Sequence, residues 1–171
     1  MAKLEGGYED DSIRELINYV STSAEMYCDR VFVSTVYTDE RHDGDGTDTV
    51  LLNQQPIISV ASFKTTKEGS VLTEEDDYVV YLAQGKIRLL AGVFPCVPLG
   101  IHVTYTAGFA TIPNDIKFSV AMAVASDMKR RDNKAWLVAT QGLGSEDSID
   151  YITARYGREV LDVWDRYARM R

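Results

Sequence analysis

The chain is poor in the residues that build metal centres, disulfide frameworks and membrane spans. Its 171 residues include two cysteines, two histidines and four prolines. Cys28 and Cys96 lie far apart, with neither metal-ligand nor C-x-x-C spacing, so both are predicted to be buried thiols. The first residues lack the apolar core of a signal peptide, and no run of about 18 apolar residues is available to cross a bilayer. We therefore expect a protein made and kept in a cytoplasm, with no membrane partner.

Basic side chains are also scarce. Lysine and arginine number 18 against 26 acidic residues, a net charge of −8. Residues 1–50 carry 12 acidic and 4 basic side chains, whereas residues 113–171 carry 9 and 10. Because an acidic chain repels phosphate backbones, high-affinity nucleic-acid binding is disfavoured, although DNA that only slides past would be compatible with this charge.

Two histidines leave few candidates for a catalytic base. His42 stands beside a turn and His102 on the polar face of a predicted strand, and neither lies in a recognisable motif. The segment Gly142–Ser145 is not a nucleophile elbow, and no Walker or dinucleotide loop is present. We expect both histidines to be surface or structural residues. The prediction is that the chain is not an enzyme and has no catalytic residue, cofactor or metal site.

Two acidic segments invite a different interpretation. Asp43–Asp48 alternates acidic with small residues like a calcium loop, but the sixth and twelfth positions hold Asp48 and Gln54 instead of glycine and glutamate. A hairpin turn is therefore predicted there, with an adventitious cation site as the alternative. Glu74–Asp77 offers paired carboxylates for acid and base work, but a solvated turn explains them more simply.

Hydrophobic periodicity predicts an α+β fold in a single domain over residues 1–171. Three helices are expected, at 11–29, 113–131 and 157–170. Between the first two, an antiparallel β insertion is expected over 31–110, as a sheet or small barrel. Its strands are predicted at 31–38, 49–52, 57–65, 78–82, 86–90 and 101–106. The aperiodic segment 141–148 is interpreted as a flexible loop.

The second and third helices carry the most distinctive compositions. Phe118–Ala125 is apolar nearly all round, so helix 113–131 is expected to be covered on more than one side. The last helix and its tail combine aromatic and arginine side chains, which dominate protein–protein hot spots. The candidate partner-binding residues are Arg158, Trp164, Arg166, Tyr167, Arg169 and Arg171. The alternative is that Trp164 and Tyr167 complete the core while the arginines remain solvated.

One stretch is specific enough to suggest a family. Residues 103–117 read V-T-Y-T-A-G-F-A-T-I-P-N-D-I-K, a strand that turns through Gly108 into a helix begun by Pro113. This string resembles the signature of the tailed-phage head-tail connector (adaptor) proteins, the gp6-like family. Three earlier segments are similar to that family in the same order: Asp10–Phe32, Asp43–Thr47 and Pro56–Val60.

The resemblance implies a structural protein of the virion neck with a helical connector core. Such a protein forms a ring of about twelve copies beneath the portal, by contacts between two different faces of each subunit. It joins the DNA-filled head to the tail and lines a channel through which DNA passes without specific binding. Its partners would be other copies, the portal protein and the next neck or tail protein. Two rival functions stay open: a small hydrolase or carbohydrate-active enzyme on a β scaffold, and a monomeric binding module.

Overall fold

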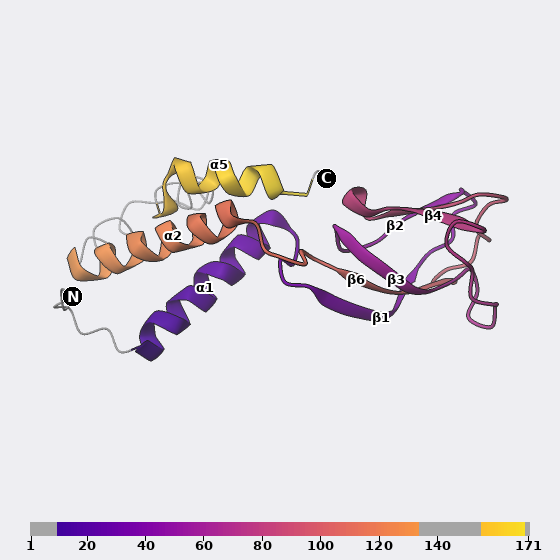
Figure 1. Cartoon of the computed structure of the whole chain (residues 1–171), viewed down its shortest axis with the longest axis horizontal. Coiled ribbons are helices and arrows are strands. Elements are labelled where there is room, and N and C mark those ends of the chain that lie inside the picture. Colours follow the sequence, from indigo (N-terminus) through magenta and orange to yellow (C-terminus); the bar gives the residue numbers. More distant parts are fainter. Residues whose placement is uncertain (1–9, 134–154, 170–171) are drawn as a thin grey trace. The chain divides into compact units, whose positions relative to one another are not determined.

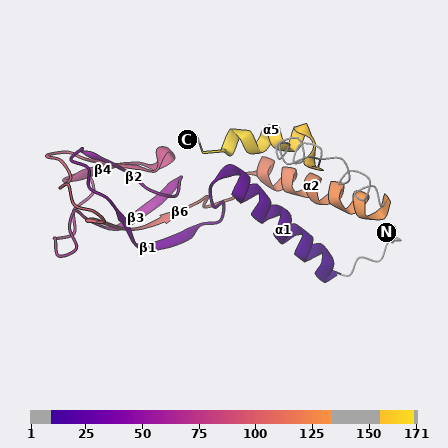
Figure 2. The ribbon, with the colours of Figure 1, turned by 180° about the vertical axis from the view of Figure 1, so that it is seen from behind.

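The computed structural model describes residues 10–133 and 155–169 as an α+β chain in which the named strands pair antiparallel. The predicted class and strand direction are therefore confirmed. The described residues form two compact units (Figures 1 and 2). The helical unit consists of the described residues up to Asp29 and from Pro113 onward, and the β unit consists of Arg30–Ile112. Among the described helices, none has the length and apolarity needed to span a membrane.

The helical unit contains three labelled helices that contact one another: α1 (Asp10–Cys28), α2 (Asn114–Asn133) and α5 (Arg158–Tyr167). Each bound lies within three residues of the predicted one. Helix α1 buries Leu16, Val20, Ala24 and Cys28, which repeat every four residues and so share one face. Asp10 and Asp11 occupy its first turn, where negative charge complements the helix dipole.

Helix α2 begins directly after Pro113, whose carbonyl oxygen accepts a hydrogen bond from the Lys117 amide at 3.2 Å. Its buried side includes Ile116, Ala123 and Val124. Its other side is open, because Phe118 is 67% exposed and Ala121 and Ala125 are exposed too. The expectation that this helix is covered on more than one side is met by α1 and α5, which both pack against it, but the face that carries Phe118 stays open.

The β unit contains two three-stranded sheets. The first has the order β1 (Thr35–His42), β6 (Ile101–Ala107), β3 (Ile57–Lys64), and the second has the order β2 (Thr49–Leu51), β5 (Lys86–Leu89), β4 (Tyr78–Tyr81). A short 3-10 helix, η1 (Leu82–Gln84), joins β4 to β5. Strands β2 to β6 each begin at the predicted residue and end within one residue of the predicted end.

The two sheets share one hydrophobic core. On β6 the odd-numbered residues Ile101 to Ala107 are buried in it, whereas His102 and Thr104 lie on the opposite face of the sheet. The Phe63 ring of the first sheet meets the Tyr78 ring of the second edge-on, with 4.8 Å between ring centroids. Because these aromatic rings come from different sheets, the sheets pack against each other through this core.

Three predictions about the β unit are wrong. The first strand lies at Thr35–His42 instead of 31–38, because its polar second half pairs with β6 as an edge strand. Asp43–Gly46 is not a hairpin turn, because β1 and β2 belong to different sheets and the segment joins them. Cys96 is exposed, whereas Cys28 is buried as predicted.

Gly108 makes the turn that the sequence assigns to it. Its φ of +112° lies in a region that L side chains rarely adopt, and a Cβ atom there would lie 2.5 Å from the Val33 carbonyl oxygen. Only glycine therefore fits at the end of β6 without moving the backbone.

Candidate functional site

Helix α5, which carries most of the predicted partner-binding residues, is held by a buried tryptophan. Trp164 is 1% exposed, and its Nε1–H donates to the Ser119 hydroxyl of α2 at 3.0 Å. Its ring also packs against Tyr27 of α1 and Tyr156, with centroid separations of 5.7 and 5.2 Å. One side chain thus joins α5 to both other helices of the unit.

Two tyrosine hydroxyls add polar contacts at the carboxyl end of α5. The Tyr27 hydroxyl donates to Asp165 at 2.6 Å, and this hydrogen bond, together with partial burial, raises the pKa of Tyr27 to about 12. The Tyr167 hydroxyl donates to Asp115, in the first turn of α2, at 2.9 Å. Burial, aided by that carboxylate, raises the pKa of Tyr167. These bonds fix the register of α5 along α1 and α2.

The six predicted partner-binding residues divide into distinct environments. Arg158 and Arg166 are exposed, Tyr167 and Arg169 are half-buried, and Trp164 lies in the core. Arg171 lies outside the described residues. For Trp164 the burial agrees with the alternative prediction of a core residue. Partner binding by this set stays a prediction.

Sequence reasoning missed a second anchor in the helical unit. Arg155 and Asp127, 28 residues apart, form a bidentate ion pair with N–O distances of 2.7 and 3.3 Å. The Arg155 guanidinium also donates to the Tyr19 hydroxyl at 3.0 Å and lies 4.9 Å from the centre of that ring. The spacing between Asp127 and Arg155 matches no motif, so nothing in the local sequence predicts that the two side chains pair.

The two histidines occupy structural positions in the β unit. His42 Nε2 lies 2.7 Å from Glu40 Oε1, and the same carboxylate accepts a hydrogen bond from the Tyr105 hydroxyl at 2.9 Å. Tyr105 is fully buried, and burial raises its pKa. His102 is 8% exposed, with Nδ1 2.6 Å from Asp39 Oδ1. It lies on the outer face of its sheet, as predicted, but is buried there.

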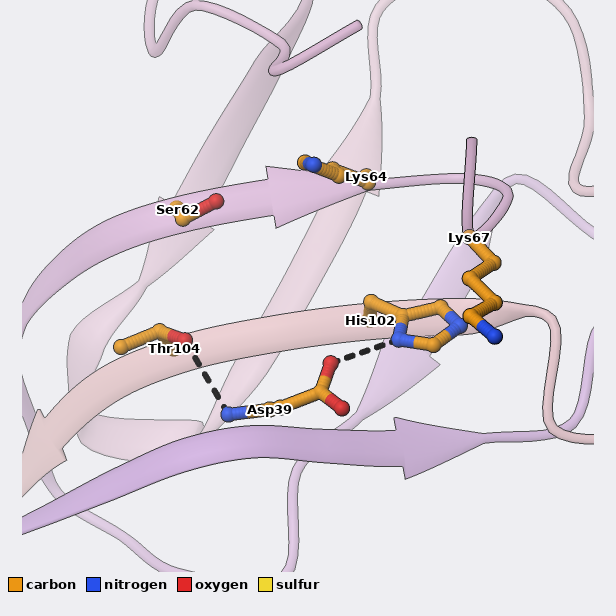
Figure 3. Close-up of a pocket in the computed structure, with 6 residues that line it drawn as sticks. All are labelled: Asp39, Ser62, Lys64, Lys67, His102 and Thr104. Atoms are coloured by element: carbon orange, nitrogen blue, oxygen red, sulfur yellow. Dashed lines mark hydrogen bonds and ion pairs between the residues drawn. The ribbon is translucent and has the colours of Figure 1, made fainter. Parts of the chain in front are cut away.

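Asp39 and His102 share a pocket with Ser62, a combination that invites comparison with a catalytic triad (Figure 3). A triad needs the serine hydroxyl within hydrogen-bond reach of the imidazole nitrogen that does not face the aspartate. No hydrogen bond joins Ser62 to His102 among the described residues. In the close-up, Nε2 of His102 lies on the side toward Lys67, whereas Ser62 lies beside Thr104. The arrangement is therefore not that of a nucleophile and its base.

The acidic segments are engaged with the protein itself. Asp43 Oδ1 accepts the Leu99 amide at 2.7 Å, Asp45 Oδ1 accepts the Thr47 amide and hydroxyl, and Asp48 pairs with Arg88 at 2.7 Å. The four residues Glu74–Asp77 are exposed, as predicted for a solvated turn. Within the described ranges, no group of three or more acidic, histidine or cysteine side chains has the geometry of a metal site.

Comparison with known proteins points to one class of assembly. The family model for the head completion protein matches residues 1–142. The neck of an empty gene transfer agent (GTA) particle, computed with C6 symmetry, has a chain with 19% identity and a TM-score of 0.58, with 96% of this chain and 81% of that chain covered. The neck of a native GTA particle, computed with C12 symmetry, gives 17% identity, a TM-score of 0.57 and coverages of 95% and 84%. A chain of the virion of the native GTA particle has 16% identity and a TM-score of 0.54, with 100% of this chain and 84% of that chain covered. None of the curated proteins matches the chain.

Proposed function

The chain belongs to the head completion protein family, and from that membership we propose that it is a structural protein of the virion neck. The observation that carries the proposal is the family match over residues 1–142. The shared fold with chains of GTA necks, over 95% or more of this chain, supports it. The sequence resemblance to head-tail connectors lies within the same residues 1–142 and agrees with the family match.

In the neck the chain forms a ring, of about twelve copies, seated beneath the portal and joining the DNA-filled head to the tail. The helical unit is the connector core and the β unit is an insertion in it. Ring closure brings one face of each subunit against a different face of the next. The open apolar side of α2, with Phe118 67% exposed, suits such a contact because a second copy would cover it. The C12 symmetry of one neck with a chain of this fold supports a second copy as the partner that covers this side of α2.

Helix α5 docks on the portal through its outward side chains. Arg158 and Arg166 supply the exposed guanidinium groups, and Tyr167, Arg169 and Arg171 extend the surface toward the chain end. Trp164 contributes by holding α5 in place, because its own ring is buried. The work is mechanical and needs no catalysis. The net charge of −8 suits a channel wall that does not retain DNA.

Gene replacement in the phage or phage-like element that encodes the chain tests this function. Deleting the gene should give DNA-filled heads and finished tails that do not join. The intact chain supplied in trans should restore joined particles, with its density in the neck by electron cryomicroscopy. A chain truncated after Gly157 should not be incorporated. Joined particles without the protein would refute a neck role, and normal incorporation of the truncated chain would refute docking through α5.

The ring contact has its own test. Phe118→Ala should leave folding of the purified chain intact and reduce incorporation into particles, because it removes apolar surface from the open side of α2 only. Val71→Ala, at another exposed apolar residue of 54% exposure in the β unit, is the matched control. Equal incorporation of both variants would contradict the contact through α2.

A further inference from the structure

The outer face of the β1–β6–β3 sheet gathers positive charge in an otherwise acidic chain. His102, on the central strand, pairs across with Arg41 on β1 and with Lys64 on β3. Side chains at paired positions lie on the same face and within about 5.5 Å of each other at Cβ. Lys67 follows β3 and lines the same pocket, a cavity of about 310 Å³. His102, Lys64 and Lys67, which come from two strands and the loop after β3, therefore line one cavity.

An irregularity in β1 orients the histidine. The strand register shifts between Tyr37 and Glu40, and Asp39 takes a φ of +52°, which is uncommon for a residue other than glycine. The Asp39 amide donates to the Thr104 hydroxyl at 3.1 Å, and its carboxylate lies 2.6 Å from His102 Nδ1. Bulges of this kind redirect side chains, often beside functional sites. Here the bulge holds the imidazole so that Nε2 faces the side of the pocket from which Lys67 comes (Figure 3).

The two lysines of the pocket have no acidic partner in the part of the chain that the structure describes. Among the described residues, no carboxylate lies within 4.0 Å of the ammonium group of Lys64 or Lys67, whereas Arg41 is paired with Asp39 at 3.0 Å. Ser62 and Thr104 add hydroxyl groups to the same lining. The Thr104 hydroxyl oxygen already accepts the Asp39 amide, so its proton is available to a ligand. Charged and neutral hydrogen-bond donors thus converge on one cavity.

We propose that this pocket binds a phosphate group. A phosphate presents several acceptor oxygens around one centre, which suits donors that arrive from β3, β6 and the loop after β3. A single carboxylate could use fewer of them. A free phosphate ion and the phosphodiester of DNA present the same acceptor oxygens, so the chemistry of the pocket suits both sources. A contact to DNA of this kind carries no sequence information and weakens with salt, so it is compatible with DNA that moves.

Titration of the purified, full-length chain with inorganic phosphate tests the site. At pH 7 and constant ionic strength, the imidazole nitrogen resonances of His102 should shift saturably in NMR spectra. Lys64→Ala combined with Lys67→Ala should weaken that binding by about tenfold or more, because both charge-assisted donors are lost. Lys117→Ala with Lys129→Ala, at two exposed lysines of α2, removes the same charge and should leave binding unchanged. A non-saturable response, or equal weakening by both double variants, would overturn the proposal.

Two further arms separate the sources of the ligand. A DNA duplex that binds, is displaced by inorganic phosphate and loses affinity with the pocket variant alone would identify the phosphodiester. Saturable binding of inorganic phosphate without binding of the duplex would identify free phosphate. Binding of an acidic peptide such as Glu-Glu-Asp-Asp without any response to phosphate would refute the proposal in favour of a protein partner. These outcomes do not depend on ring assembly, so they stand apart from the neck function.

Discussion

Replacing Trp164 with alanine should destabilise the helical unit more than any change at its surface. The indole is 1% exposed and contacts side chains of α1 and α2. Truncating a buried tryptophan or phenylalanine to alanine removes about 3–5 kcal/mol, which includes the cavity left behind. Loss of the Nε1–H bond to Ser119 adds roughly 1 kcal/mol or less, since the serine hydroxyl keeps its bond to the Ile116 carbonyl. We expect a decrease of about 4 kcal/mol in the free energy of unfolding.

Urea unfolding followed by circular dichroism at the helix band measures this effect. With a slope of about 2 kcal/mol per molar urea, the midpoint should fall by roughly 2 M. Trp164→Phe keeps an aromatic ring and loses the donor, so about 1–2 kcal/mol is expected. Phe118→Ala truncates an aromatic side chain that is 67% exposed and should stay within about 0.5 kcal/mol of the parent. Equal effects of Trp164→Ala and Phe118→Ala would refute the assignment of Trp164 as the core anchor.

Three further predictions concern a turn, a hydroxyl and His42. Gly108→Ala should lower stability by roughly 3 kcal/mol in thermal or urea unfolding, because its methyl group would meet the Val33 carbonyl at a φ of +112°. The pKa of Tyr27 is raised to about 12 in the folded chain, so its hydroxyl stabilises the folded state below the ordinary value near 10, and that stabilisation is lost as pH rises toward 12. Tyr27→Phe should therefore reduce the alkaline loss of stability and lower the tyrosinate absorbance near pH 12 by the share of one of the ten tyrosines. His42→Gln should leave the yield of tailed particles nearly unchanged, as measured by titre.

Each of these predictions has an outcome that contradicts it. Gly92 has a φ of +76°, and no atom lies within 4 Å of an added Cβ, so Gly92→Ala measures backbone strain alone. An equal loss of stability in Gly92→Ala and Gly108→Ala would show that the close Val33 carbonyl does not matter. An unchanged alkaline titration in Tyr27→Phe would argue against the bond to Asp165. If the histidine variant joins heads to tails normally but abolishes infectivity, an enzymatic role must be reconsidered.

The strands of the β unit could be predicted because their periodicity is local. In β6, buried Ile101, Val103 and Tyr105 alternate with residues of the other face, and glycine or proline marks most of the turns. The predicted range 31–38 begins and ends four residues before β1, because Asp39–His42 is polar and the bulge breaks the alternation of the strand. The turn residues of Asp43–Gly46 suggest a hairpin, because such residues indicate a reversal of the chain without specifying which strand pairs next.

The candidate site was predictable only in part. The aromatic and arginine composition of α5 marked Trp164, but composition alone could not decide between core and surface. The pairs Asp39–His102 and Asp127–Arg155 are 63 and 28 residues apart, and no spacing rule connects them. The open side of α2 was not predictable for another reason. An apolar helix face indicates that something covers it, and the sequence does not say whether the cover belongs to the same chain.

The division of the helical unit between two distant parts of the chain has a consequence for synthesis on the ribosome. Helix α1 is made early, but the Trp164 carbonyl that accepts the Cys28 thiol comes 136 residues later. At about 5–20 residues per second that delay is on the order of ten seconds. All strands of the β unit emerge within this interval and find their partners among themselves. A lone helix of 19 residues is marginal in water, so α1 waits with its apolar stripe uncovered until α2 and α5 arrive. Nascent chains that stop short of Trp164 should therefore combine a folded β unit with an unprotected α1, a feature that chaperones and proteases recognise.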